Sequence, residues 1–98
     1  MATTTVDAQS ETDAPGSTPD AHIAALRTRI DEIDTTLVAL WQERATLSRQ
    51  VGSTRVAAGG TRLVLARERE ILDRFRLALG DDGTQLALLL LRAGRGPL

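Results

Sequence analysis

Residues 26–55 read LRTRIDEIDTTLVALWQERATLSRQVGSTR, and this stretch determines the fold of the chain. Its large aliphatic side chains recur at alternating spacings of four and three residues. They are Leu26, Ile30, Ile33, Leu37, Leu40, Leu47 and Val51. Arg44 fills the one gap in the series, and Arg55 continues it after Val51. The spacing predicts a helix with one apolar stripe of heptad character.

The predicted long helix extends in both directions from this stretch, over residues 21–57. Asp20 is a suitable N-cap with Pro19 just outside the helix, and Gly59-Gly60 is a stop signal. About 37 residues at ~1.5 Å each give a helix of roughly 55 Å. A domain of ~80 residues is only about 25–30 Å across. The long helix therefore needs a partner, and a second antiparallel copy is the simplest one.

Two shorter helices are predicted after the long one. The second helix starts at Val64 or Ala66 and ends at Leu79, residues 80–83 form a turn, and residues 86–91 form a third helix that is apolar on all sides. No alternating strand pattern is present. The predicted fold class is all-α, with three helices per chain, one long and two short, in an intertwined antiparallel homodimer.

The two ends of the sequence differ in composition from the rest. Residues 1–20 hold four acids and no basic residue, and they are predicted to be a disordered tail before a single domain at 21–98. Residues 94–98, GRGPL, are predicted to be a non-helical tail. The start of the chain lacks the features of a secretory signal, and no apolar run reaches the ~18 residues that a membrane span needs. These features predict a cytoplasmic protein without a membrane interaction.

The charged residues exclude several classes of function. All 12 basic residues are Arg, and outside residues 1–20 they face nine acids. This small positive excess, with almost no aromatic residues for base stacking, argues against nucleic-acid binding. The absence of Cys excludes thiolate chemistry, and a single His, His22, offers no metal cluster. We expect neither a metal nor a cofactor.

Two arginines on the apolar stripe are the first candidate site residues. A charged residue on a buried face is costly unless it is paired, so each of Arg44 and Arg55 is either part of a structural ion pair or part of an anion site. Their Cα atoms are ~16 Å apart along a helix, and two long side chains can converge on one small anion between them. In an antiparallel dimer with its two-fold axis near Leu37, Arg27 of one chain lies opposite residue 47 of the other. Arg27 would then join Arg44 and Arg55, although taken alone it fits a surface charge better.

The run TRLVLARERE at residues 61–70 supplies further charged candidates. Arg67 and Glu68 open the second helix there, whereas Arg62 and Arg69 fit exposed ion pairs at a solvated helix start. No nucleophile–base pair is visible, since Ser48 and Ser53 have no His nearby in the sequence. A site rich in cations and poor in acid–base groups suits a reaction that needs anion binding but no proton transfer.

These features together resemble the all-helical chorismate mutases, especially their short subclass. The long helix is similar to the family pattern L-R-x-x-I-D-x-I/L-D-x-x-L-x-x-L-x-x-x-R, followed by a Gly and a basic residue. The segments AAGGTRLV, ARERE and LLLLRAGRG resemble the short subclass, and the likeness covers residues 26–98. The resemblance implies the rearrangement of chorismate to prephenate, without a cofactor.

The resemblance also implies roles for the arginines of the long helix. Arg27 would reach across from the partner chain and bind one substrate carboxylate, and Arg44 would bind the other from its own chain. Arg55 stands where the family has Lys or Arg facing the ether oxygen of the bond that breaks.

The remaining implied site residues lie at the start of the second helix. Arg67 matches an Arg that shapes the substrate pocket. Glu68 matches the residue that accepts the ring hydroxyl, and the backbone of Val64 would lie beside that hydroxyl.

One departure from the family concerns the third helix. Longer members carry a Gln late in that helix that contacts the ether oxygen, and here Gln85 is at the wrong end. In the short subclass, activity is raised by complex formation with DAHP synthase, and the C-terminal tail takes part. The resemblance therefore implies modest activity alone and a DAHP synthase partner that engages residues 94–98.

Two alternatives remain at this stage. A related enzyme acting on aminodeoxychorismate or isochorismate would need nearly the same arginines, and Glu68 would be the discriminating contact. A non-catalytic helical dimer acting as an adaptor is the other alternative, but Arg44 and Arg55 would be a needless cost in it.

Overall fold

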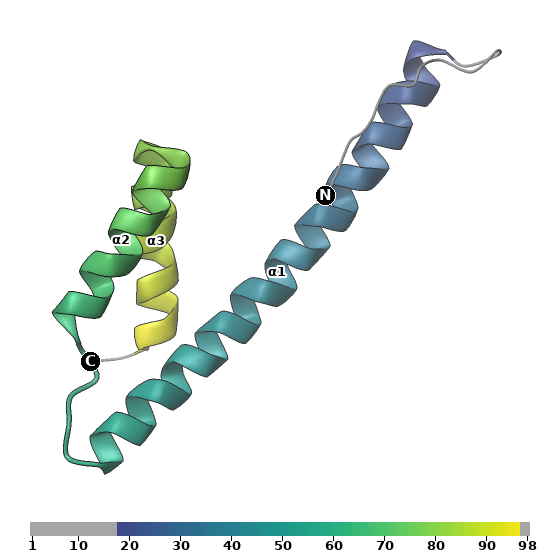
Figure 1. Cartoon of the computed structure of the whole chain (residues 1–98). Helices are drawn as coiled ribbons and strands as arrows, with labels where there is room; N and C mark the ends of the chain where they lie inside the picture. Colours follow the sequence, from purple (N-terminus) through teal and green to yellow (C-terminus); the bar gives the residue numbers. More distant parts are fainter. Residues whose placement is uncertain (1–17, 97–98) are drawn as a thin grey trace. The chain divides into compact units, whose positions relative to one another are not determined.

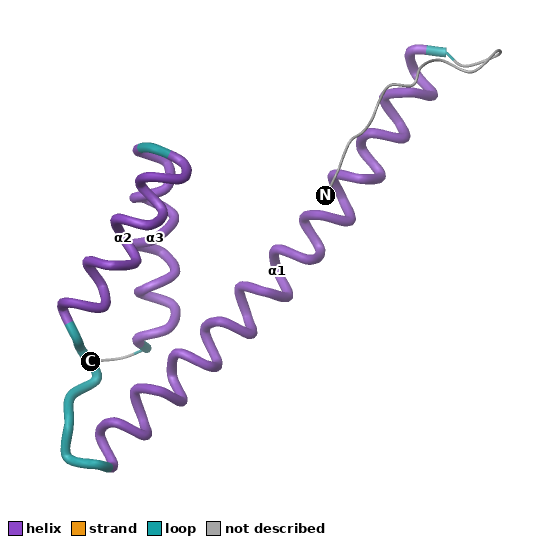
Figure 2. Tube along the Cα trace, in the orientation of Figure 1, coloured by secondary structure: helices purple, strands orange, loops and turns teal. Residues whose placement is uncertain are grey.

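The computed structural model describes residues 18–96, which form three helices and no strand (Figures 1 and 2). They are α1 (Pro19–Ala57), α2 (Leu65–Leu79) and α3 (Asp81–Arg95). The predicted all-α class with one long and two short helices is confirmed. The chain divides into two units, residues 1–36 and 37–98, which are described separately below. Most of the predicted N-terminal tail, residues 1–17, lies outside the described residues.

Helix α1 begins slightly earlier than the sequence predicts. The backbone N–H of Ala21 donates a hydrogen bond to Thr18 Oγ1 at 3.0 Å, so Thr18 is the N-cap and the prediction of Asp20 was wrong. Pro19 is the first helical residue, a position where its missing N–H has no cost and its fixed φ suits the helix. Asp20 lies in the first turn, where its carboxylate faces the positive end of the helix dipole. Helix α1 thus starts two residues before its predicted start at residue 21.

The apolar stripe of α1 is uncovered in both units of the chain. In the first unit, four aliphatic side chains of the helix are 42% to 53% exposed: Ile23, Leu26, Ile30 and Ile33. In the second unit, four more are 53% to 59% exposed: Leu37, Leu40, Leu47 and Val51. The buried hydrophobic residues among those described are only Ala45, Ile71, Ala87 and Leu90. The described residues of a single chain therefore leave this apolar stripe in contact with water.

Helices α2 and α3 lie side by side as a hairpin within the second unit (Figure 1). Gly80, with φ of 72°, makes the turn between them, and α3 starts immediately afterwards at Asp81. The predicted turn at 80–83 and helix start at residue 86 were therefore wrong. Gly83 belongs to the first turn of α3, where it is buried against the backbone carbonyl of Phe75. A side chain at residue 83 would clash there, so this Gly serves helix packing.

The end of α3 packs on α1 within the same unit. A Cβ atom added to Gly94 would lie 2.6 Å from Ser48 Oγ, so the two helices approach too closely for a side chain at this point. Arg49 Nη1 also donates a hydrogen bond to the carbonyl of Ala93 at 3.0 Å. The helix continues to Arg95, so the prediction of a non-helical tail was wrong for Gly94 and Arg95. Residues 97 and 98 lie outside the described part of the chain.

Candidate active site

A cavity of about 280 Å³ lies in the second unit, lined by the last turns of α1, the loop after it, the start of α2 and the end of α3. Its size is near the lower end of the roughly 300–1,000 Å³ typical of small-molecule sites. The charged residues on its walls are Arg44, Arg55, Arg62, Arg67, Glu68 and Arg95. Five cations around one carboxylate make the cavity electropositive, and it therefore suits a small ligand with more than one negative charge.

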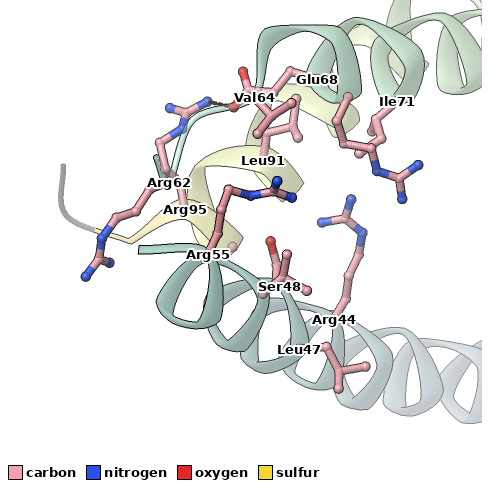
Figure 3. Close-up of a pocket in the computed structure, with 14 residues that line it drawn as sticks. Arg44, Leu47, Ser48, Arg55, Arg62, Val64, Glu68, Ile71, Leu91 and Arg95 are labelled. Atoms are coloured by element: carbon pink, nitrogen blue, oxygen red, sulfur yellow. Dashed lines mark hydrogen bonds and ion pairs between the residues drawn. The ribbon is translucent and has the colours of Figure 1, made fainter. Parts of the chain in front are cut away.

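Arg44 projects into this cavity from α1 (Figure 3). Its Nη1 atom donates to the carbonyl of Leu90 at 3.4 Å. Partial burial, and then repulsion from Arg67 and Arg74, lowers the pKa of the Arg44 guanidinium. Neither Arg44 nor Arg55 takes part in an ion pair within residues 18–96, so both cations are available to an anionic ligand.

Arg55 projects into the same space from the last turn of α1. Figure 3 shows its guanidinium and that of Arg44 directed toward a common region, with Ser48 between them on the helix. The aliphatic part of Arg55 rests on Gly60, because a Cβ atom there would lie 2.7 Å from Arg55 Cγ. The backbone N–H of Gly60 also donates to the carbonyl of Arg55 at 2.8 Å. The loop after α1 thus limits where the Arg55 side chain can go.

Among the described residues, Glu68 supplies the one carboxylate on the cavity wall. Its Oε2 accepts a hydrogen bond from Arg95 Nη2 at 2.8 Å, and the two side chains are only 22% and 25% exposed. Arg67, one residue earlier, pairs instead with Glu70 at 2.8 Å, with both side chains more than half exposed. Val64 lies just before α2 in an extended conformation and lines the cavity beside them.

The cavity brings together five of the six predicted site residues, Arg44, Arg55, Val64, Arg67 and Glu68. Arg27 belongs to the first unit and does not line the cavity. Arg62, predicted to lie at the surface, and Arg95, predicted to lie in a tail, both line the cavity. Arg62 could have been identified as a site residue from its place in the segment AAGGTRLV, which resembles the short subclass. The position of Arg95 depends instead on tertiary contacts.

Other kinds of site are not formed by the described residues. No three His, Cys, Asp or Glu side chains gather where they could hold a metal ion in residues 18–96. None of the helices in that range is both long enough and apolar enough to cross a bilayer. The cavity does present five arginines close together, and such a set of cations can hold and polarise a small polyanion.

Comparison with known proteins gives consistent matches. Residues 26–89 match the model of the family described as chorismate mutase type II. The chain is 51% identical over 73 residues to the intracellular chorismate mutase of Mycolicibacterium smegmatis. This match covers 74% of this chain and 70% of that protein. It is 48% identical over 82 residues to the intracellular chorismate mutase of Mycobacterium tuberculosis, covering 84% and 77% of the two chains.

A solved structure resembles the fold as well. It is the non-covalent complex of DAHP synthase and chorismate mutase from Corynebacterium glutamicum with a bound transition state analogue. The matched chain is 42% identical, with a TM-score of 0.76, and the match covers 81% of this chain and 95% of that one.

Proposed function

The chain belongs to the chorismate mutase type II family, and on that premise we propose that its arginine-lined cavity is the active site. The protein is an isomerase of the shikimate pathway. It converts chorismate to prephenate by an intramolecular Claisen rearrangement, for phenylalanine and tyrosine biosynthesis. The observation that carries the placement of the site is the convergence of five arginines and Glu68 on one cavity of suitable size.

Substrate binding is assigned to Arg44 and to Arg27 of a second chain. Chorismate is a flexible dicarboxylate, and each forked guanidinium matches one carboxylate. Holding both carboxylates favours the folded conformer in which the two reacting carbons meet, so binding supplies a proximity effect. Arg44 is partly buried, which strengthens its interaction with an anion because water screens it less.

Stabilisation of the transition state is assigned to Arg55. The ether C–O bond breaks while the new C–C bond forms, and negative charge grows on the ether oxygen. A cation fixed beside that oxygen gains more energy in the transition state than in the ground state, which is the requirement for catalysis. No proton moves, so the absence of an acid–base pair among the proposed site residues is compatible with the reaction.

The ring end of the substrate is assigned to the start of α2. Glu68 would accept the hydrogen bond of the ring hydroxyl, the backbone of Val64 would lie beside the hydroxyl, and Arg67 would shape the wall. All three line the cavity opposite α1. Glu68 is therefore the contact that would distinguish chorismate from its amino and iso analogues.

The proposed active form is an intertwined antiparallel homodimer. The eight exposed aliphatic residues of α1 form a stripe that residues 18–96 do not cover, and such a stripe marks an interaction surface. A second copy offers an identical stripe, so the two long helices would bury each other. The same arrangement would bring Arg27 of each chain to the cavity of the other.

The conversion itself is tested with the purified full chain. We expect NMR of the protein mixed with chorismate to show prephenate as the product, with no added metal or cofactor, and slower turnover of aminodeoxychorismate. Faster turnover of the amino compound, or release of pyruvate from isochorismate, would favour the related activities instead. A chain that converts none of the three would favour the adaptor alternative.

A complex with DAHP synthase is proposed from the solved structure of the relative. We place the enzyme in the cytoplasm with this partner, because the relatives at about half identity are named intracellular. Because Gly94 and Arg95 belong to α3, the part of the predicted tail left to engage the partner is residues 96–98.

Titration with the cognate DAHP synthase is expected to raise kcat/KM about tenfold or more, within the usual range of coupling between two sites. Ending the chain after Gly96 should remove most of this rise and leave the basal rate nearly unchanged, since α3 stays complete. Equal stimulation of both forms would show that residues 97 and 98 do not couple the proteins. If neither form is stimulated, the proposal that DAHP synthase activates this protein is wrong.

A further inference from the structure

We propose that Arg95 determines which ring substituent the active site accepts, by pairing with Glu68 so that the site favours a neutral hydroxyl over a cationic amino group. The inference rests on the proposed function, in which Glu68 contacts that substituent. Arg95 is thereby a specificity-determining residue that acts together with Glu68.

The ion pair between Arg95 and Glu68 differs from the others in the described chain. The other three join residues three apart on one helix, and all their side chains are more than half exposed. This pair joins α3 to α2, its side chains are 25% and 22% exposed, and both residues line the cavity. The Nε atom of Arg95 is buried and has no partner within residues 18–96. Charges shielded from water in this way interact more strongly with a ligand beside them.

The backbone holds Arg95 in place for this contact. The residue before it, Gly94, lies so close to Ser48 that any side chain there would clash, which fixes the last turn of α3 on α1. The hydrogen bond from Arg49 to Ala93 ties the same turn to α1. The helix ends at Arg95 itself, and the C-cap is Gly96, whose φ is 69°. Arg95 therefore starts from a defined position at the rim of the site.

The chemistry of the pair explains the preference. A lone carboxylate attracts an ammonium group strongly, but Arg95 neutralises Glu68, so the pair carries no net charge for an ammonium to meet. A hydroxyl can donate to Glu68 and accept from an N–H of Arg95, whereas an ammonium group has only donors. An unpaired donor in a shielded site is costly, so the amino compound is rejected.

The test compares kcat/KM for chorismate and for 4-amino-4-deoxychorismate in the full-length protein. We define the ratio as kcat/KM for chorismate divided by kcat/KM for the amino compound. In Arg95→Gln this ratio should fall about tenfold or more, the size expected for a change of one unit charge near the substituent. Arg95→Lys keeps the charge and should keep most of the ratio. Arg92→Gln, which removes an exposed Arg of the same helix outside the cavity, is the matched control and should leave the ratio unchanged.

The outcomes separate this inference from its premise. An unchanged ratio in Arg95→Gln, with both kcat/KM values lowered equally, would show a merely structural residue and overturn the inference. Arg95→Met gives a second neutral variant of similar length should the Gln variant fail to fold. Glu68→Gln tests the premise. Full activity and an unchanged ratio in that variant would show that Glu68 does not contact the ring substituent, and the proposed role of Glu68 would then be wrong.

Discussion

Replacing Arg44 by Ala is expected to lower kcat/KM by ~10²–10³, the usual consequence of leaving one shielded charge without its partner. Arg44 is a partly buried cation of the cavity, and it forms no ion pair with a carboxylate of the described residues. Arg27→Ala is expected to have a similar effect, since the other substrate carboxylate would then be unpaired. Arg29→Ala removes an exposed Arg two residues from Arg27 and should retain activity.

Mixing the two inactive variants is expected to restore activity. Each pocket combines Arg44 of one chain with Arg27 of the other, so a mixed dimer has one intact pocket and one that lacks both arginines. Random exchange makes half of the dimers mixed, and activity should return to about a quarter of the wild-type value. Steady-state assays after refolding the mixture would measure it. A mixture no more active than its parents would show that Arg27 does not serve the opposite pocket.

The sequence predicts the long helix well because its signals are local. The four-and-three spacing from Leu26 to Arg55 identifies the stripe, and the helix ends before Gly59-Gly60 as expected. The same stripe singles out Arg44 and Arg55, because a cation at an apolar position is conspicuous. The error at the start was small, as Thr18 and Asp20 are both good capping residues and only the fold shows which one is used.

The second half of the chain was harder to predict because its glycines serve packing. Gly83 and Gly94 both suggested turns or tails, since Gly has a low helix propensity. In the structure each lies inside α3 at a point where a neighbouring helix leaves no room for a side chain. Arg95 and Glu68 are 27 residues apart in the sequence, and their pairing follows from that packing. No local sequence pattern indicates it.

Arg55 is the residue whose substitution most directly tests the chemical step. Its aliphatic stem rests on Gly60 and its backbone carbonyl accepts from the N–H of Gly60, so the loop restricts the positions open to this exposed side chain before the substrate arrives. A group positioned in advance has little reorganisation to undergo as charge develops on the ether oxygen. Its contribution should therefore appear in the rate of the bound complex rather than in affinity.

Arg55→Met is accordingly expected to lower kcat by ~10²–10³ while KM changes little, since the interaction is made mainly in the transition state. Arg55→Lys keeps a cation at the same place and should retain much of kcat. It is the matched control that separates loss of the charge from a change in side-chain size. Initial rates over a range of chorismate concentrations give both constants, and circular dichroism shows that each variant is folded. A rise confined to KM would mean that Arg55 binds substrate and transition state equally, and the ether oxygen would then need another cation of the cavity, Arg62 or Arg67, as its partner.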